Sequence, residues 1–260
     1  MQKSVLITGA TSGIGYELTH AFATEKYNLV LVARSKEKLE TIKKELEKQY
    51  QISVEVIPKD LSVKDAPEEI YETLFANNKR IDILVNSAGF GDFGDFVDSN
   101  WNKQYSMIQL NIVAVIHMTR LFLKPMVERG NGKILNLAST AAFQPVPFQS
   151  IYAASKAFIL SFSEALSKEL KDSGVTVTAL CPGATQTAFY DVASLQNSKA
   201  FKTLKVAQAR DVASYGYREL MKGRPVVIHG FINRLLTFII RFIPRNLTRE
   251  ISYRITKKVN

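Results

Sequence analysis

Short apolar segments alternate with longer helical patterns along most of this chain of 260 residues. The apolar segments are rich in Val, Ile and Leu, which is typical of strands buried on both faces of a parallel sheet. They span residues 3–8, 28–33, 53–57, 81–86, 132–138, 175–181 and 225–228, and helix patterns lie at 14–26, 35–49, 65–77, 101–128 and 152–173. Because no Asn-Gly or Asp-Gly hairpin turn joins two strands, we expect right-handed crossovers. The order predicts an α/β fold: a doubly wound, seven-stranded parallel sheet between two layers of helices.

The composition fits one domain of this kind. Hydrophobic residues make up 46% of the chain and charged residues 22%, as in a globular protein. The single cysteine, Cys181, excludes a disulfide framework and is expected to be a small buried side chain in a reducing cytoplasm. The first strand follows Met1 almost directly, and we recognise neither a signal peptide nor an apolar run of the ~20 residues that span a bilayer. His20, His117 and His229 lie far apart in sequence, so no metal site is expected.

A glycine-rich loop follows the first strand, with the sequence Thr8-Gly9-Ala10-Thr11-Ser12-Gly13-Ile14-Gly15. Glycine permits the tight turn, lets a pyrophosphate approach the backbone, and lets the next helix pack closely on the sheet. The helix N-terminus adds free N–H groups and partial positive charge. The loop predicts a dinucleotide site with contacts from Gly9, Thr11, Ser12, Gly13, Ile14 and Gly15; the alternative is a purely structural loop.

The second strand ends in Val32-Ala33-Arg34-Ser35. A carboxylate at this position binds the ribose 2′-hydroxyl of NAD, and none is present here. Arginine pairs well with phosphate, so Arg34 and Ser35 favour the 2′-phosphate of NADP. The alternative is a surface arginine that begins a charged helix.

Tyr152 and Lys156 lie four residues apart in a helix pattern, and Ser139 precedes the tyrosine by 13 positions. Residues four apart share a helix face, so an ammonium is expected beside the phenol. A nearby cation lowers the pKa of a phenol and makes it a usable acid or base. The spacing alone is weak, because Tyr253 and Lys257 repeat it without an upstream serine. The alternative is a solvated helix face.

These features together resemble the short-chain dehydrogenase/reductase family, over residues 3–187 and again in the last strand. The resemblance implies a Rossmann-type fold in one domain, residues 1–230. Asp60-Leu61 resembles the pair that contacts the adenine ring. Asn86-Ser87-Ala88-Gly89 resembles the family's Asn-Asn-Ala-Gly, with serine replacing the second asparagine, a change expected to affect sheet support more than chemistry. Further implied cofactor contacts are Asn86, Ala88, Gly89, Pro182, Gly183, Thr185 and Thr187.

The resemblance also implies a catalytic tetrad of Asn111, Ser139, Tyr152 and Lys156. Ser139 would bind a substrate carbonyl oxygen and Tyr152 would protonate it. Lys156 would lower the pKa of Tyr152 and hold the nicotinamide ribose, and NADPH would supply hydride. Asn111 would sit at a kink whose carbonyl anchors a water; its alternative is an ordinary exposed asparagine. A homodimer or homotetramer through the helices at 101–128 and 152–173 is implied as well.

Apolar residues follow Ser139 and suggest the substrate class. Phe143 and Phe148, with Phe90 and Phe93, predict an apolar cleft, and residues 187–223 are expected to form a lid over it. A bulky hydrophobic ketone or aldehyde (acyl, sterol or aromatic), or the corresponding secondary alcohol, is therefore favoured. The alternatives are core or subunit contacts for Phe143 and Phe148, and an ordinary pair of surface helices for the lid segment. A non-catalytic NADP-binding scaffold or sensor remains the alternative from another class.

The C-terminal segment, residues 231–260, carries most of the net charge of +10. It holds seven basic residues and one acid, Glu250, which leaves +6. Apolar residues are interspersed with the arginines, so a basic amphipathic extension is expected. It is open whether it caps the cleft, packs on another subunit or lies on an anionic membrane surface, where the protein would reduce lipid intermediates. No nucleic-acid-binding motif accompanies the charge.

Overall fold

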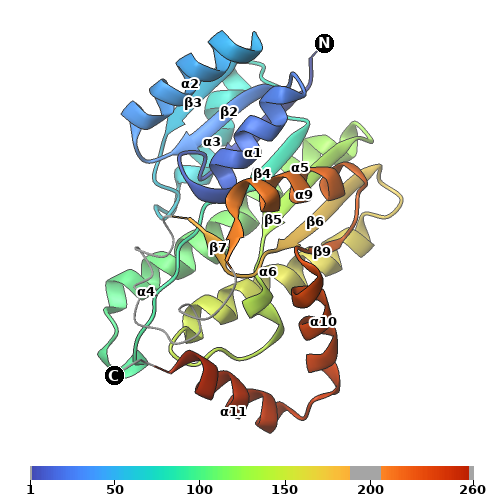
Figure 1. Ribbon diagram of the computed structural model, residues 1–260. Helices are drawn as coiled ribbons and strands as arrows, with labels where there is room; N and C mark the ends of the chain where they lie inside the picture. Colours follow the sequence, from blue (N-terminus) through green and yellow to red (C-terminus); the bar gives the residue numbers. More distant parts are fainter. Residues whose placement is uncertain (1, 188–205, 258–260) are drawn as a thin grey trace.

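The computed structural model describes residues 2–187 and 206–257, and its centre is a sheet of seven parallel strands (Figure 1). The strand order is β3-β2-β1-β4-β5-β6-β9. Their bounds are β1 Ser4–Thr8, β2 Asn28–Ala33, β3 Val54–Pro58, β4 Ile83–Asn86, β5 Gly132–Leu137, β6 Val175–Cys181 and β9 Val226–Ile228. The order reverses between β1 and β4, which opens a crevice at the carboxyl ends of these strands. The predicted doubly wound sheet is confirmed.

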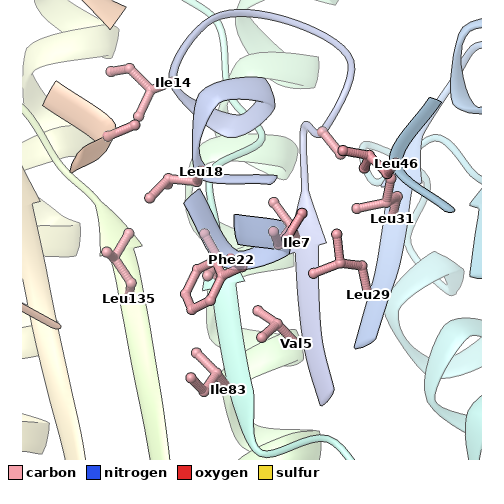
Figure 2. Packing of buried hydrophobic residues seen from close by; sticks show 14 of the residues in the cluster. Val5, Ile7, Ile14, Leu18, Phe22, Leu29, Leu31, Leu46, Ile83 and Leu135 are labelled. Carbon is pink, nitrogen blue, oxygen red and sulfur yellow. The ribbon is translucent and has the colours of Figure 1, made fainter. Parts of the chain in front are cut away.

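Three helices cover one face of the sheet: α1 (Gly13–Thr24), α2 (Lys36–Tyr50) and α9 (Ala209–Met221). Side chains alternate along β1, so Val5 and Ile7 face this layer while Leu6 faces the other. Leu18 and Phe22 of α1 pack on that surface and are fully buried (Figure 2). The alternation explains why the strands read as continuous apolar runs: both of their faces are covered.

The opposite face is covered by α3 (Ala66–Ala76), α5 (Ala114–Glu128) and α6 (Ser150–Glu169). The helix predicted over 101–128 consists of α4 (Trp101–Ile108), a π-helical turn at Gln109–Val113, and α5. By length and composition Trp101–Glu128 is apolar enough to cross a membrane. Its Met118, Phe122 and Met126 are instead buried against the sheet, as in a core helix.

The predicted lid at 187–223 is not one element. Residues 188–205 lie outside the described residues. Two short strands, β7 (Thr185–Gln186) and β8 (Ala207–Gln208), pair in parallel next to α9. Because Val212, Ala213 and Leu220 of α9 are buried in the core, assigning 209–221 to a lid was wrong.

The C-terminal extension begins at Gly230, whose positive φ of 90° turns the chain out of β9. It forms α10 (Phe231–Ile239), a 3₁₀ turn (Ile240–Phe242) and α11 (Arg245–Thr256). Figure 1 shows α10 leading away from the sheet and α11 running along the lower edge of the molecule. Short 3₁₀ turns at Phe96–Asp98 and Thr140–Phe143 complete the framework around the crevice.

Candidate active site

The glycine loop forms a close-packed bend between β1 and α1. Gly9 has a φ of 69°, and its N–H donates to Val32 O at 2.9 Å. A Cβ on Gly9 would lie 2.8 Å from the Cα of Ala88, and one on Gly15 would lie 2.3 Å from Gly9 O. Ser12 caps α1 without a side-chain hydrogen bond, which leaves the first N–H groups for an anion. This bare backbone cradle fits a dinucleotide pyrophosphate.

Thr8 joins the loop to the end of β4. Its hydroxyl accepts hydrogen bonds from the backbone of Ser87 at 3.0 Å and of Ala88 at 3.1 Å. Ser87, which replaces the second asparagine of the family pattern, is therefore held in place through its main chain. Thr8 was placed in the loop from the sequence, but this bond to the end of β4 was not predicted, because a threonine ending a strand carries no distinct signal. Thr187 reaches the same loop, because a Cβ on Gly13 would lie 2.9 Å from its methyl group.

Three predicted cofactor contacts turn their side chains into the protein. Asn86 Nδ2 donates to Asn136 Oδ1 at 2.9 Å and to Thr119 Oγ1 at 3.1 Å, and it ties β4 to β5 and α5. Ile14 and Leu61 are buried in the two main core clusters. For these residues only the backbone is open to a cofactor, because their side chains support the sheet and the helices.

The predicted adenosine end lies at the carboxyl ends of β2 and β3. Arg34 is exposed and forms no ion pair among the described residues. Ser35 caps α2 and accepts from Lys38 N at 3.3 Å. Asp60 Oδ1 accepts from Ser62 N at 2.9 Å, which fixes the turn after β3. An unpaired guanidinium beside a helix N-terminus is suited to a phosphate.

The segment after β6 connects both halves of the site. Pro182 O accepts from Thr140 N at 2.9 Å, which holds the Ser139 turn against it. Thr185 Oγ1 donates to Gly183 O at 2.9 Å. A Cβ on Gly183 would lie 2.5 Å from Asn233 Nδ2 of α10. The extension therefore begins directly against the predicted nicotinamide segment.

Asn111 occupies the predicted kink, now seen as the π-helical turn. Its Nδ2 donates to Phe90 O at 2.9 Å, and its Oδ1 accepts from Phe90 N at 3.2 Å. Nδ2 also approaches Ser155 Oγ at 3.2 Å. Asn111 is buried rather than exposed. This side chain thus fixes the segment after β4 to α6, and π-helical turns frequently occur at functional sites.

Ser139, Tyr152 and Lys156 converge as predicted. The ammonium of Lys156 lies 5.8 Å from the ring centroid of Tyr152, on one face of α6. Its Nζ donates to Leu137 O at 2.7 Å and would lie 3.6 Å from a Cβ on Gly89. Ser139 forms a hydrogen bond with the Tyr152 phenol. The three side chains and Gly89 therefore surround one small volume.

The predicted lowering of the Tyr152 pKa is wrong for the protein alone. Burial raises the pKa of Tyr152 to about 12, although the hydrogen bond with Ser139 acts in the opposite direction. Burial also lowers the pKa of Lys156 to about 8. Burial disfavours both the phenolate of Tyr152 and the ammonium of Lys156. Its effect on the pKa of Tyr152 exceeds the attraction between these two charged forms that the four-residue spacing suggested. At neutral pH the phenol therefore keeps its proton.

Burial similarly raises the pKa of the neighbouring Cys181 to about 12, so this thiol is an inert, fully buried side chain as predicted.

A cavity of about 310 Å³ reaches Tyr152 from the side of α4. Phe93 and Phe148 line it, with ring centroids 5.8 Å apart, whereas the predicted Phe90 and Phe143 are not among its lining residues. Most of the lining is polar, so the prediction of an apolar cleft describes only one wall of this cavity. Its other wall is polar. Lys103 Nζ lies 2.6 Å from Asp92 Oδ1, and Gln104 Nε2 donates to Asp92 Oδ2 at 2.8 Å.

Two buried amides on this cavity were missed in the sequence. Gln104 Oε1 and Gln149 Nε2 have no hydrogen-bond partner within residues 2–187 and 206–257, although both residues are more than nine-tenths buried. Gln104 shares a helix face with Met107 and Asn111, and this polar residue on an inward face was the available signal. Gln149 stands in a loop, where no periodicity could identify it.

Comparison with known proteins assigns the chain to a family. The model of the short chain dehydrogenase family matches residues 3–197. Mouse 17-beta-hydroxysteroid dehydrogenase type 3 is 37% identical over 205 residues, which cover 78% of this chain and 66% of that protein.

Two solved structures agree with this assignment. A short-chain dehydrogenase from Sphingobium yanoikuyae in complex with NADPH is 30% identical, with a TM-score of 0.82, and covers 93% of this chain and 96% of its own. A bulky-bulky ketone specific alcohol dehydrogenase from Comamonas testosteroni is 28% identical, with a TM-score of 0.77, and covers 94% and 95%. The chain belongs to the short-chain dehydrogenase/reductase family, whose members are oxidoreductases that bind a nicotinamide cofactor.

Proposed function

We propose that this protein is an NADPH-dependent oxidoreductase that interconverts a bulky hydrophobic ketone or aldehyde and its alcohol. The observation that carries the proposal is the arrangement of three side chains: the Tyr152 phenol is hydrogen-bonded to Ser139, and the Lys156 ammonium lies 5.8 Å from the centroid of its ring. A general acid must hold its proton until the transition state needs it. Burial raises the pKa of Tyr152 to about 12, so the phenol holds its proton at neutral pH, and the neighbouring ammonium of Lys156 favours the phenolate that forms when this proton is transferred.

The residues have separate roles in reduction. The glycine loop and Lys156 would hold the dinucleotide, whose chemistry would be hydride transfer to the carbonyl carbon. Ser139 donates a hydrogen bond to the carbonyl oxygen, where negative charge develops, and Tyr152 passes its proton to that oxygen. The positive charge of Lys156 stabilises the phenolate that results, and its lowered pKa lets it exchange protons near neutral pH. Asn111 holds Phe90 and α6 in register around this volume.

NADP is the proposed form of the cofactor because of the charge at the end of β2. Arg34 is exposed and unpaired among the described residues, and no carboxylate follows this strand to bind a ribose 2′-hydroxyl. The NADPH complex of the Sphingobium yanoikuyae protein supports the same assignment.

The proposed substrate class rests on the cavity at Tyr152. Phe93 and Phe148 favour a bulky apolar body, while the free amide atoms of Gln104 and Gln149 favour one polar substituent. The names of the mouse steroid dehydrogenase and of the ketone-specific enzyme support the same class.

We also propose a homodimer or homotetramer. Trp101 and Tyr105 of α4 and Phe158 of α6 are exposed aromatic residues on the helices that the family resemblance assigns to subunit contact.

The test is reduction of a panel of hydrophobic ketones and aldehydes, followed by loss of NADPH absorbance with NADH in parallel. We expect turnover to be more efficient with NADPH. Tyr152→Phe should lower kcat about 1000-fold or more, within the range of general acid catalysis, while NADPH affinity changes only a few-fold.

Retained turnover in Tyr152→Phe would contradict the role of the phenol. Equal efficiency with both cofactors would contradict the role of Arg34. Tight NADPH binding by the wild type without turnover of any carbonyl would favour a sensor.

A further inference from the structure

The helices of the C-terminal extension turn polar side chains toward the protein and apolar side chains outward, whereas the helices of the domain do the reverse. In α11, Thr248, Ser252 and Thr256 recur every four residues and are less than 10% exposed. The apolar residues of the same helix, Leu247, Ile251 and Ile255, are exposed. The hydroxyl of Thr256 donates to Ser252 O at 2.8 Å within the helix. Small polar side chains thus face the protein and branched apolar ones face outward.

The same inversion holds in α10. Thr237 is 6% exposed, whereas Phe231 is 73% exposed. The outward apolar residues continue into the 3₁₀ turn; they are Phe231, Ile232, Leu235, Leu236, Phe238, Ile239 and Phe242. Single exposed apolar residues are common, but a contiguous set of this size marks an interaction surface. We call the outward apolar residues of α10, the 3₁₀ turn and α11 the apolar face.

Basic residues flank the apolar face. Arg234, Arg241, Arg245 and Arg249 are exposed and form no ion pair among the described residues. The one acid of the segment, Glu250, pairs with Arg254 at 2.9 Å. The extension therefore presents unpaired positive charge on the same helices as its exposed apolar residues.

The charge distinguishes between the possible occupants of this surface. A second copy docked through the same face would bring two arginine-rich surfaces together, and like charges at an interface are unfavourable. An anionic bilayer complements both features, because its headgroups pair with arginine while its acyl chains accept the phenylalanines. We propose that α10 and α11 dock on an anionic lipid surface, with the apolar face in the headgroup and acyl-chain boundary.

The docked face lies next to the substrate cavity. Tyr253 of α11 packs on Phe148, with ring centroids 5.7 Å apart, and Phe148 lines the cavity that reaches Tyr152. A hydrophobic carbonyl dissolved in the bilayer thus has a short path to the phenol; this link, unlike the docking itself, rests on the proposed function.

Cosedimentation of the full chain with vesicles tests the docking. Vesicles of phosphatidylcholine with phosphatidylglycerol should bind the wild type, and vesicles of phosphatidylcholine alone should bind it much less. Arg241→Gln, Arg245→Gln and Arg249→Gln combined should weaken anionic-vesicle binding roughly 100-fold, since each basic residue near such a surface contributes about fivefold.

The apolar part is tested by Phe231→Ser, Phe238→Ser and Phe242→Ser combined, which should weaken binding about tenfold or more. Phe75→Ser is the matched control, because Phe75 is 72% exposed on α3, outside the extension. It should leave binding unchanged. Phe231, Phe238 and Phe242 are exposed, so the triple variant should keep its NADPH affinity. Retained NADPH affinity would show that the domain of the variant is folded.

Failure of the wild type to bind anionic vesicles at low salt would overturn the proposal. The proposal would also be overturned if the triple phenylalanine variant and Phe75→Ser lost anionic-vesicle binding to the same extent. Light scattering that shows the phenylalanine variant losing a subunit partner while vesicle binding is absent would overturn it as well. NADPH binding and turnover are measured separately, so failed docking is distinguishable from failure of the proposed function.

Discussion

Helix α1 of the domain and helix α10 of the extension contain similar apolar residues, but these residues are buried in α1 and exposed in α10. Leu18 and Phe22 of α1 are fully buried, whereas Leu235 and Phe238 of α10 are 46% and 58% exposed. The difference lies in what faces each helix. The β1–β2 surface covers α1, while in α10 the protein covers mainly Asn233 and Thr237. The comparison teaches that apolar periodicity predicts a helix with an apolar face, but not the surface on which that face packs.

The largest expected difference between the two regions is in stability. Phe22→Ala removes a ring that contacts Tyr27 and Tyr217 inside the core. It should lower the free energy of unfolding by about 3–5 kcal/mol. Phe231→Ala in α10 should change it by about 0.5 kcal/mol or less, as for other surface positions. Urea unfolding of both variants measures the contrast, and a loss of similar size in Phe231→Ala would show that the extension is part of the cooperative core.

The second contrast concerns charge. Lys156 is a buried cation in the domain with a pKa lowered to about 8, whereas the arginines of the extension are exposed to water. As pH rises through about 8, Lys156 loses the charge that attracts the cofactor. NADPH affinity should then fall by up to about tenfold per pH unit, while anionic-vesicle binding stays constant.

Fluorescence titration of NADPH into Tyr152→Phe measures this fall without turnover. Lys156→Met is the control, because it should bind weakly at every pH and show no fall above pH 8. A pH-independent affinity in Tyr152→Phe would contradict a buried, titrating Lys156.

The smallest expected effect is on the inner face of the extension. The Ser252 hydroxyl is buried and has no hydrogen-bond partner in the part of the chain that the structure describes. Ser252→Ala should therefore stabilise the docking of α11 by about 1 kcal/mol, because an unsatisfied hydroxyl is removed. Limited proteolysis within 245–256 should become slower. Faster cleavage would show that this hydroxyl does have a partner in solution.

Local sequence patterns predicted much of the framework. All seven strands were predicted to within two residues at their ends, because a buried parallel strand needs an uninterrupted apolar run. Gly9 and Gly15 were recognised because a residue whose backbone lies very close to another segment cannot carry a Cβ. The structure shows such close contacts, of Gly9 with Ala88 and of Gly15 with Gly9 O. The proximity of Tyr152 and Lys156 followed from helix geometry alone.

The errors share a different cause. The pKa of Tyr152 was predicted from one neighbouring charge, but burial by several segments determines it. The side-chain partners of Asn86, Thr119 and Asn136, lie far along the chain, so no local pattern could show that this side chain supports the sheet and leaves only its backbone for the predicted cofactor contact. The free amides of Gln104 and Gln149 meet at one cavity only after α4 and the loop before α6 come together.

The sequence by itself determined the order of strands and helices, the glycine bend and the residues of the catalytic face, since each depends on chemistry within a few neighbouring positions. The tertiary structure decided which groups lose contact with water. Dehydration depends on everything that packs around a side chain, and so it alone established that Tyr152 keeps its proton and that the phenylalanines of the extension remain outside.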